Sequence, residues 1–572
     1  MRLLKVECEA LIARHPESRA WGFILEYVLP RERGRRPDLV ILTGCSLNVI
    51  EFKGREFAEQ ADLDQVSAYG RDLAEYHGES HHLRVNRVLS LDGTHMPPQK
   101  IDDVWVVGGK RLSLCLDHLA DDPPCHAPDI EKWVNADYSP LPTLVKAARR
   151  IFDHEPLPSL RRATSAGIPE ALQVLQSAAI SAERNSERHI ALVTGVPGAG
   201  KTLVGLQLVY NTRFTGEDGE RPAVFLSGNG PLVDVLQHAL KSRIFVQDVH
   251  GFLVTYGGGA TKLPAEHIFV YDEAQRAWDS ERVAGKRGHN LSEHQDFVNI
   301  GMRMPNWSML VGLIGQGQEI HLGEEGGLEL WNDAITASGG DWVIHCPKAI
   351  ADFFPGRRVI IDDALNLSMT LRSHLAGDLH EWVAQLLAGK LERASELSAS
   401  IHAASFNLYV TRELEEAKRY VRERYDGSLD SRFGLLASSK AKTLPNYGIN
   451  ASFQATRRFR PGRWYNDPPT SLASCCQLLM VATEFQCQGL ELDFPIVGWD
   501  SDLLWDGDTW VTKAGRSHAK DARQLRLNSY RVLLTRGRDG MIIFIPPVSE
   551  FDSTFDALRT SGCKELGLRV QI

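Results

Sequence analysis

The sequence lacks four features that would point to familiar classes of protein. It has no basic excess, because its net charge is −9, so any binding to nucleic acid has to come from local clusters. Its nine cysteines show neither a CxxC pair nor a Cys/His ligand spacing, which argues against a zinc knuckle and a disulfide framework. No apolar run approaches about 18 residues, so we expect no transmembrane helix. The acids in the first apolar stretch do not resemble a secretory signal. We therefore expect a cytoplasmic protein.

The composition is that of a globular protein, with 43% hydrophobic and 24% charged residues in 572 positions. Its clearest break is at residues 154–170, where prolines, small residues and a basic pair interrupt the periodicity. Beyond this break, apolar strands alternate with helical stretches, which is typical of parallel sheets with crossover helices. We predict an α/β domain over 1–153, a linker over 154–170, and two further α/β domains over 171–353 and 354–572.

A phosphate-binding loop is the strongest motif. GVPGAGKT matches G-x-x-x-x-G-K-[ST] and stands between a predicted strand and a predicted helix, the context that this motif requires. The glycines let backbone N–H groups surround the phosphates, the lysine reaches the β- and γ-oxygens, and the threonine ligates Mg²⁺. The residues expected to bind ATP in this loop are Gly195, Gly198, Gly200, Lys201 and Thr202.

Two further strands end in residues suited to nucleotide chemistry. HIFVYDEAQ ends in Asp272, expected to hold Mg²⁺ through water, and Glu273, expected to orient or deprotonate the attacking water. SMLVGLIG is followed by Gln318, an amide that either senses the γ-phosphate or belongs to an ordinary polar loop. Together with the phosphate loop, these residues predict an ATPase.

PDLVILTGCSLNVIEFKG, residues 37–54, contains a second candidate site. Side chains alternate along a strand, so Glu51 and Lys53 project to the same face. If the two apolar runs pair, Asp38 comes near them. Two carboxylates can hold Mg²⁺ and a water, and a lysine can lie against the scissile phosphate. The alternative is an ordinary hairpin with polar residues at its ends.

The blocks GVPGAGKT, LSGNGPLVDVL, VYDEAQ, GLIGQGQEI, LNLSMTLRS, ATEFQCQGLELD and YRVLLTRGRDG occur in an order that resembles the superfamily 1 helicases, particularly their schlafen-like branch. The resemblance covers roughly residues 165–550 and implies two RecA-like P-loop α/β domains. It implies that Gln176 reads adenine and that Arg372 and Arg536 stabilise charge on the γ-phosphate. The residues that it implies couple nucleotide state to nucleic-acid contact are Thr483, Gln488, Gly489 and Glu491.

A second resemblance, in the N-terminal region, depends on two residues that follow the hairpin. Gln65 and Tyr69 are spaced i, i+4 on one helix face. After D…E-x-K, this Q-x-x-x-Y spacing resembles the PD-(D/E)xK nucleases fused to recombination helicases, and it implies a restriction-endonuclease-like domain using Mg²⁺ or Mn²⁺. The glutamine would position the lysine or a water, and the tyrosine would contact substrate. Glu26 is either a further metal ligand or an edge-strand acid.

These observations predict an ATP-dependent nuclease-helicase or translocase, with a role in defence against foreign DNA suggested by the fused architecture. The expected partner is nucleic acid, with DNA favoured over RNA. RRFRPGR, residues 457–463, offers arginines for phosphates and Phe459 for stacking. The alternatives are a solvated basic loop and a contact to an acidic partner domain. Arg35 and Arg36 either draw a phosphate towards the metal or balance neighbouring acids. The alternative function is a nucleic-acid-binding ATPase switch whose N-terminal domain docks without cutting.

Overall fold

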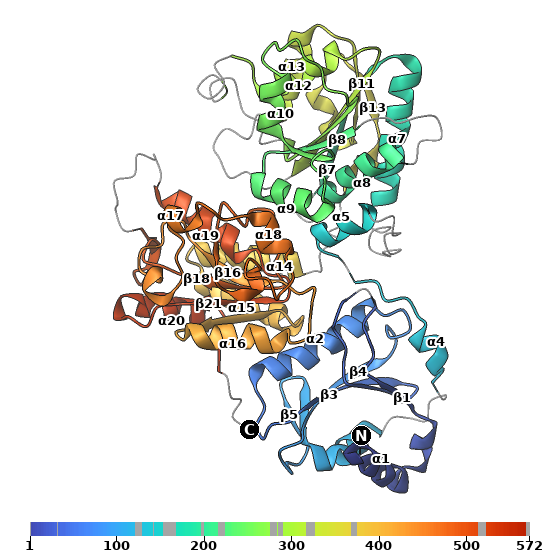
Figure 1. Cartoon of the computed structure of the whole chain (residues 1–572), viewed down its shortest axis with the longest axis vertical. Coiled ribbons are helices and arrows are strands. Elements are labelled where there is room, and N and C mark those ends of the chain that lie inside the picture. Colours follow the sequence, from blue (N-terminus) through green and yellow to red (C-terminus); the bar gives the residue numbers. More distant parts are fainter. Residues whose placement is uncertain are drawn as a thin grey trace. The chain divides into compact units, whose positions relative to one another are not determined.

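The computed structural model divides into two compact units, each described by itself. Unit 1 comprises residues 1–140, 377–459 and 467–572, and unit 2 comprises residues 141–376 and 460–466. Figure 1 shows the chain coloured by residue number, with some of the helices and strands labelled. Among the described residues, no helix is both long and apolar enough to cross a membrane. The structure describes residues 2–30, 32–120, 128–140, 142–152, 167–195, 199–214, 223–274, 283, 290–315, 327–367, 375–512 and 522–567.

The N-terminal domain, the part of unit 1 up to residue 140, contains a six-stranded mixed sheet in the order β1-β2-β3-β4-β6-β5. Helix α2 covers one face of this sheet, and α1 with α3 covers the other. Consecutive residues of β2 therefore enter opposite cores: Val40 packs beside α2, whereas Leu39 and Ile41 pack beside α1 and α3. Burial of both faces explains why β2 is a continuous apolar run.

The elements of this domain are α1 (Arg2–Arg14), η1 (Pro16–Ala20), β1 (Gly22–Leu25), β2 (Leu39–Leu42), β3 (Ser46–Lys53), α2 (Gln60–Tyr76), β4 (Arg84–Leu91), β5 (Gln99–Ile101), β6 (Val104–Gly108), η2 (Gly109–Arg111), α3 (Leu112–Ala120) and α4 (Ile130–Val134).

Unit 2 is built on a parallel sheet in the order β13-β12-β7-β11-β10-β8-β9, with β14 also paired to β7. Strand β7 lies between β11 and β12, so the phosphate loop that follows it starts from the middle of the sheet. The carboxyl ends of parallel strands are where α/β sheets bind ligands. The elements of unit 2 outside its 460–466 segment are α5 (Leu144–Phe152), α7 (Ile168–Asn185), β7 (Arg188–Gly195), α8 (Lys201–Phe214), β8 (Ala223–Ser227), α9 (Gly230–Leu240), β9 (Val246–Asp248), α10 (Val249–Tyr256), β10 (Ile268–Asp272), α12 (Glu293–Arg303), β11 (Ser308–Gly315), α13 (Gly327–Ser338), β12 (Trp342–Cys346), η4 (Lys348–Phe353), β13 (Arg358–Ile361), η5 (Asp363–Leu365) and β14 (Asn366–Leu367).

The remainder of unit 1, residues 377–459 and 467–567, forms a domain that we call the C-terminal domain. Its parallel sheet has the order β17-β16-β18-β21-β15-β22, and a small hairpin joins β19 to β20. Its elements, with the helices that flank it in the chain, are α14 (Leu375–Leu387), α15 (Leu391–Ala403), β15 (Asn407–Thr411), α16 (Leu414–Arg424), β16 (Phe433–Ala437), η6 (Leu444–Tyr447), α17 (Phe453–Thr456), α18 (Pro461–Asn466), η7 (Cys475–Gln477), β17 (Val481–Thr483), β18 (Phe494–Gly498), β19 (Leu504–Trp505), β20 (Trp510–Val511), α19 (Ala522–Leu534), β21 (Gly540–Phe544), η8 (Ser549–Phe551), α20 (Asp552–Thr560) and β22 (Lys564–Glu565).

The predicted α/β fold class is confirmed, because a mixed α/β domain is accompanied by two parallel α/β sheets. The alternation of apolar stretches with helices in the sequence indicated this class. The inner strands of the parallel sheets are apolar because they are buried. Most of the predicted linker lies outside the described residues, while α7 already begins at Ile168. Strand β13 at 358–361 pairs with β12 in unit 2. The predicted domain bounds remain predictions.

Candidate active sites

The hairpin of β2 and β3 positions the first candidate site. The two strands are antiparallel, with Leu39 opposite Ile50. Asp38 immediately precedes β2, so this register places it beside the end of β3. There its Oδ2 atom accepts a hydrogen bond of 2.8 Å from the backbone N–H of Phe52. The hairpin thus brings a carboxylate from the start of one strand to the acid-x-lysine end of the other.

Helix α2 adds an amide and a phenol to this carboxylate group. The Nζ atom of Lys53 lies 3.3 Å from Oε1 of Glu51 and donates a 2.8 Å hydrogen bond to Oε1 of Gln65. The Nε2 atom of Gln65 in turn donates to the hydroxyl oxygen of Tyr69 at 3.4 Å. The i, i+4 spacing puts the amide and phenol on the same helix face. The lysine is therefore held by the Glu51 carboxylate and the Gln65 amide, and its Nζ atom also lies 3.8 Å from Oδ1 of Asp62.

Burial governs the electrostatics of the site. It raises the pKa of Glu51 to about 7, against the opposing effect of Lys53. It also raises the pKa of Asp38, and it raises the pKa of Tyr69 to about 12, so the phenol is protonated at neutral pH. The Glu51 side chain is only 7% exposed, and its Oε2 atom has no hydrogen-bond partner among the described residues. A buried acceptor without a partner is costly, and a bound cation would satisfy it.

Few side chains at this site could act as metal ligands. Among the described residues there is no group of three or more His, Cys, Asp and Glu side chains able to hold a metal ion. Glu26 is 54% exposed and pairs at 2.8 Å with Nε of Arg36, so it serves as an ion-pair acid in this structure. Of the carboxylates predicted as metal ligands in this domain, Asp38 and Glu51 remain. Mg²⁺ is commonly held by one or two carboxylates together with waters and substrate phosphates.

Metal binding at this site should depend on pH through Glu51. A carboxyl group with a pKa of about 7 must lose its proton to bind a cation, so the affinity of the nucleotide-free protein for Mn²⁺ should rise about tenfold between pH 6 and pH 8. Calorimetric titration in two buffers of different ionisation heat should detect proton release at pH 6 and little at pH 8. The raised pKa also means that Glu51 makes the metal-free fold less stable as pH rises from about 4.5 to 7.

The matched control for this titration is Glu51→Gln, which keeps the shape of the side chain but cannot ionise. It should bind Mn²⁺ weakly, with no change in affinity over the same pH range. An affinity of the wild type that is flat between pH 6 and pH 8 would contradict the assignment of Glu51 as a ligand.

The phosphate loop connects β7 to α8, and Gly198 lies outside the described residues. Gly200 has a φ of 91°, a left-handed conformation that suits glycine, and α8 begins at the next residue, Lys201. The Nζ atom of Lys201 donates a 2.7 Å hydrogen bond to the backbone oxygen of Gly195. A side chain at Gly195 would have its Cβ 2.6 Å from the backbone oxygen of Leu367, so the start of the loop has no room for one.

The acid at the end of β10 meets this loop. The hydroxyl of Thr202 donates to Oδ1 of Asp272 at 3.2 Å, and Asp272 is buried. The structure thus brings together the threonine and the aspartate expected to share a magnesium ion. The next residue, Glu273, has a φ of 54°, an uncommon conformation for a non-glycine residue. Gln176 is half-buried on α7, a helix that packs against β7 and α8.

Like Gly198, the sequence-predicted ATP-site residues Gln318 and Arg372 lie outside the described residues. Arg536 is described, and its guanidinium donates to the backbone oxygens of Val532 at 2.8 Å and Leu490 at 3.2 Å. The contact with Leu490 places Arg536 against the ATEFQCQGLELD block, which contains the residues predicted to couple the nucleotide to nucleic acid.

That block connects β17 to β18 in the C-terminal domain. Gly489 has a φ of 74°, so the block contains a left-handed turn between Gln488 and Glu491. The backbone N–H of Leu492 donates to the oxygen of Arg536 at 2.8 Å, and the N–H of Arg538 returns a bond of 2.9 Å to Leu492. The two motifs, 46 residues apart, therefore form one bonded pair of loops.

An exposed aromatic pair near α17 was not predicted from the sequence. Phe453 is 80% exposed and Phe485 is 64% exposed. The Nε2 atom of Gln486 lies 3.5 Å from the backbone oxygen of Thr456, which links α17 to the turn that bears Phe485. Phe459, which the sequence pattern favours for base stacking, is half-buried. Local periodicity gives no signal that a single aromatic residue faces solvent.

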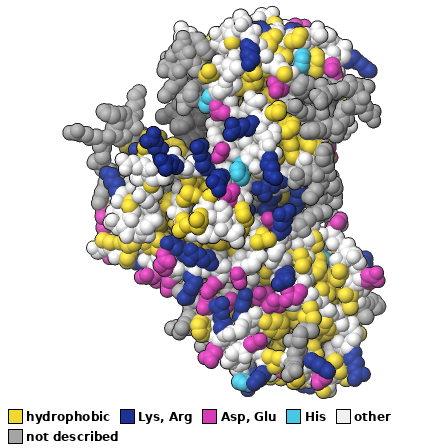
Figure 2. All heavy atoms as spheres, in the orientation of Figure 1, with side chains coloured by type: hydrophobic (Ala, Val, Ile, Leu, Met, Phe, Trp, Pro, Cys, Tyr) yellow, Lys and Arg dark blue, Asp and Glu magenta, His cyan; other side chains and the backbone are white. Residues whose placement is uncertain are grey.

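Basic residues accompany these aromatic residues. Arg457 and Arg458 follow α17 directly and are exposed, and in the face shown in Figure 2 Lys and Arg side chains gather in this region. By contrast, Arg35 and Arg36 balance acids, because Arg35 pairs with Glu32 at 2.5 Å and Arg36 pairs with Glu26.

A phosphate loop after the middle strand of a parallel sheet, with its threonine bonded to a strand-end aspartate, defines a P-loop nucleotide hydrolase. The chain belongs to the family described as Schlafen group 3, DNA/RNA helicase domain, whose model matches residues 188–547. It is therefore a helicase-like, ATP-hydrolysing enzyme that acts on nucleic acid. The family model stops short of the N-terminal domain.

Other comparisons add no functional argument. No curated protein matches the chain. Among solved structures, the chain is similar to the Pyrococcus furiosus Hef helicase domain, with 10% identity, 67% of this chain and 97% of that chain covered, and a TM-score of 0.24. It is also similar to S. cerevisiae Dbp5 bound to RNA and ADP BeF3, with 10% identity, 67% and 78% coverage, and a TM-score of 0.18.

Proposed function

We propose that the chain is an ATP-dependent nuclease-helicase or translocase, in which the helicase core hydrolyses ATP and the N-terminal domain cleaves phosphodiester bonds with Mg²⁺ or Mn²⁺. The observation that carries the cleavage step is the group of Asp38, Glu51 and Lys53, in which Glu51 is buried and one of its oxygens has no partner among the described residues. The combination of a nuclease and a motor in one chain supports the further proposal that it acts in defence against foreign DNA.

In the proposed cleavage reaction, Asp38 and Glu51 would hold the metal. When bound, Mg²⁺ would lower the pKa of a coordinated water and neutralise charge on the phosphate. Lys53 would contact the scissile phosphate, and Gln65 would orient the ammonium group through its 2.8 Å hydrogen bond. Tyr69, which is protonated because burial raises its pKa to about 12, would donate a hydrogen bond to a substrate oxygen.

In the proposed ATPase reaction, Lys201 would neutralise the β- and γ-phosphates, and Thr202 with Asp272 would hold Mg²⁺. Glu273 would orient the attacking water, and Arg536 would stabilise charge in the transition state. The 3.2 Å bond between Thr202 and Asp272 supports the magnesium assignment. Of the remaining candidates, Gln176 would recognise adenine, Gln318 would sense the γ-phosphate, and Arg372 would stabilise charge. Gln488, Gly489 and Glu491 would couple the nucleotide state to nucleic-acid contact.

Single-stranded nucleic acid should stimulate ATP hydrolysis, with DNA acting more strongly than RNA. Phe453 and Phe485 would stack on bases while Arg457 and Arg458 neutralise phosphates. We expect Phe453→Ala to raise the concentration of single-stranded DNA needed for half-maximal stimulation by about five- to a hundredfold, because each stacked base contributes about 1–3 kcal/mol. Steady-state ATP hydrolysis with oligo-dT and oligo-U measures this.

The matched control is Val254→Ala, an exposed apolar residue of unit 2 at 69% exposure, which should leave the half-maximal concentration unchanged. If neither polymer stimulates the wild type, the chain is not a motor. A different outcome is that nucleic acid strongly stimulates ATP hydrolysis and binds in a nucleotide-dependent way, but is not cut in Mg²⁺ or Mn²⁺. In that case the chain is an ATPase switch with a docking domain, and the nuclease proposal is wrong.

A further inference from the structure

Helix α2 contacts the C-terminal domain through the residue that precedes Gln65. Asp64 is a buried acid whose side chain is 8% exposed. Its Oδ2 atom accepts hydrogen bonds from the hydroxyl of Tyr409 at 2.7 Å and from the hydroxyl of Tyr420. Its Oδ1 atom accepts from Nδ2 of Asn407 at 3.3 Å. Both carboxylate oxygens of a residue on α2 are thus bonded to side chains that lie more than 340 positions further along the chain.

A buried arginine compensates the charge of Asp64. The NH1 atom of Arg424, whose side chain is 2% exposed, lies 3.4 Å from Oδ2 of Asp64. The same nitrogen donates to Oδ1 of Asn407 at 2.7 Å and to the hydroxyl of Tyr420. A carboxylate buried to this degree needs both a counter-charge and hydrogen bonds, and breaking such a group is strongly destabilising. The contacts of Asp64 therefore fix the position of α2 against the C-terminal domain.

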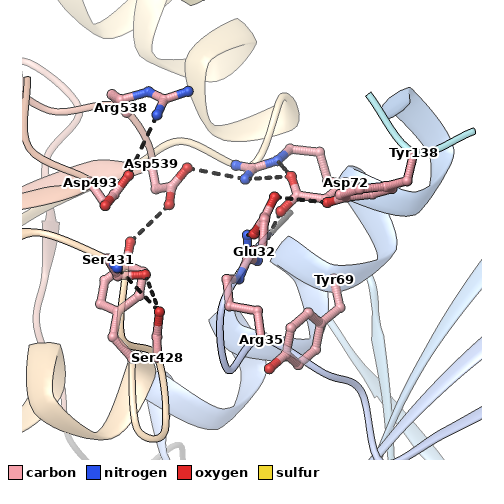
Figure 3. Close-up of polar contacts among 12 residues, drawn as sticks. Glu32, Arg35, Tyr69, Asp72, Tyr138, Ser428, Ser431, Asp493, Arg538 and Asp539 are labelled. Carbon is pink, nitrogen blue, oxygen red and sulfur yellow. Dashed lines mark hydrogen bonds and ion pairs between the residues drawn. The ribbon is translucent and has the colours of Figure 1, made fainter. Parts of the chain in front are cut away.

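A second contact lies almost two turns further along α2. Arg71 donates from Nε to Asp72 at 2.9 Å and from NH2 to Oδ1 of Asp539 at 3.1 Å. The hydroxyl of Tyr425 donates to the other oxygen of Asp539 at 2.9 Å. Burial raises the pKa of Asp539, but Arg71 and other guanidinium groups lower it more, so its pKa lies below the ordinary value and it is ionised. Figure 3 shows Asp539 and Asp72 within one line of polar contacts.

This line of contacts continues to the cleavage site. Oδ2 of Asp72 pairs with NH2 of Arg35 at 2.8 Å, and the guanidinium of Arg35 lies 5.3 Å from the centre of the Tyr69 ring. Figure 3 shows Arg35 between Asp72 and Tyr69. The chain of contacts thus runs from Asp539 through Arg71 and Asp72 to a proposed substrate-contacting residue.

A hollow shows how close the C-terminal domain comes to the site. Gln65 and Tyr69 line it from α2, while Arg424 and Tyr425 line it from the C-terminal domain. Gln65 and Tyr69 of the proposed cleavage site therefore line a hollow that the C-terminal domain helps to form.

We infer that Tyr409, Tyr420 and Asp539 of the C-terminal domain are positioning residues for cleavage, because they fix α2 and thereby Gln65 and Tyr69. This inference rests on the proposed function. The metal ligands are on the hairpin of β2 and β3, so a displaced α2 would leave the metal in place and misplace the lysine's amide partner and the phenol. Small displacements of such groups lower catalytic rates strongly.

The test is the double variant Tyr409→Phe/Tyr420→Phe in the full chain, which removes both phenol donors to Asp64 and preserves volume. We expect kcat for cleavage of labelled DNA to fall roughly tenfold, the range seen when groups that orient a site are removed. The Mg²⁺ concentration for half-maximal cleavage should be unchanged. Amide hydrogen exchange should become faster in residues 60–76 and remain unchanged in residues 39–53.

The matched control is Lys564→Ala. It removes an exposed pair in which Nζ of Lys564 lies 3.7 Å from Oδ2 of Asp102, between the same two domains. It should alter neither kcat nor exchange in residues 60–76. If the double variant is insoluble, Arg71→Lys, which keeps the charge facing Asp539 but not its fork of donors, undergoes the same measurements with the same expected direction.

Three results would overturn the inference: unchanged exchange in residues 60–76, faster exchange with unchanged kcat, or an equal fall in kcat in the Lys564→Ala protein. A wild type that cuts no nucleic acid would instead refute the proposed function. In that case the exchange measurement still decides whether the C-terminal domain positions α2, so the two failures are distinguishable.

Discussion

Lys53→Ala is expected to reduce DNA cleavage to background while leaving ATP hydrolysis at the wild-type rate. The ammonium group is the only proposed phosphate-contacting cation in the N-terminal site, and removing one preorganised electrostatic donor commonly lowers kcat by about a hundredfold or more. The ATPase residues lie in unit 2 and in the C-terminal domain, and none of their described contacts includes Lys53. Loss of labelled cut product and steady-state ATP hydrolysis measure the two activities in the same preparation.

Two further variants sharpen the Lys53 experiment. Lys53→Arg should also fail, because a planar guanidinium cannot reproduce the single 2.8 Å contact of the ammonium with Gln65 in the same space. Lys110→Ala, an exposed lysine of the same domain, should cut normally. Cleavage that survives Lys53→Ala in pure protein would refute the site assignment.

Lys201→Ala should abolish ATP hydrolysis. The residue opens α8 and its Nζ atom donates to the backbone oxygen of Gly195 at 2.7 Å, at the start of the loop that would surround the phosphates. Without this charge, we expect ATP turnover to fall by about a hundredfold or more. Lys348→Ala, an exposed lysine of unit 2, is the control. A Lys201→Ala protein that hydrolyses ATP normally would refute the phosphate-loop assignment.

The cleavage activity of the Lys201→Ala protein reveals how the two sites are coupled. Cutting at the wild-type rate, with and without ATP, would mean that the N-terminal site works autonomously. Cutting that disappears in the variant and needs ATP in the wild type would mean that nucleotide gates the nuclease. Labelled DNA and RNA, each with and without divalent metal, should be tested in parallel, because the preference for DNA over RNA is itself a prediction.

The sequence was most informative where the residues of a site lie close together along the chain. The eight residues of the phosphate loop indicate a nucleotide site because their order alone specifies the backbone turn and the placement of the lysine. The same holds for Glu51 and Lys53, whose separation by two residues puts them on one strand face, and for Gln65 and Tyr69, whose spacing puts them on one helix face.

Sequence reasoning was weaker for single residues whose role depends on exposure. It selected Phe459 for base stacking, whereas Phe453, six positions earlier, is the strongly exposed aromatic residue. It left open whether Arg35 and Arg36 attract phosphate, and the structure pairs both with acids. Exposure and ion pairing are properties of the packed molecule, and a short stretch of sequence does not contain them.

The sequence by itself thus determined the α/β class, the phosphate loop, and the strand face and helix face that carry candidate chemistry, because each follows from local spacing. Only the tertiary structure decided that Lys53 bonds to Gln65, that one oxygen of Glu51 is left without a described partner, and that Asp64 is bonded to the C-terminal domain. The physical reason is that spacing fixes the face on which a side chain lies, whereas packing of distant segments decides what that face meets.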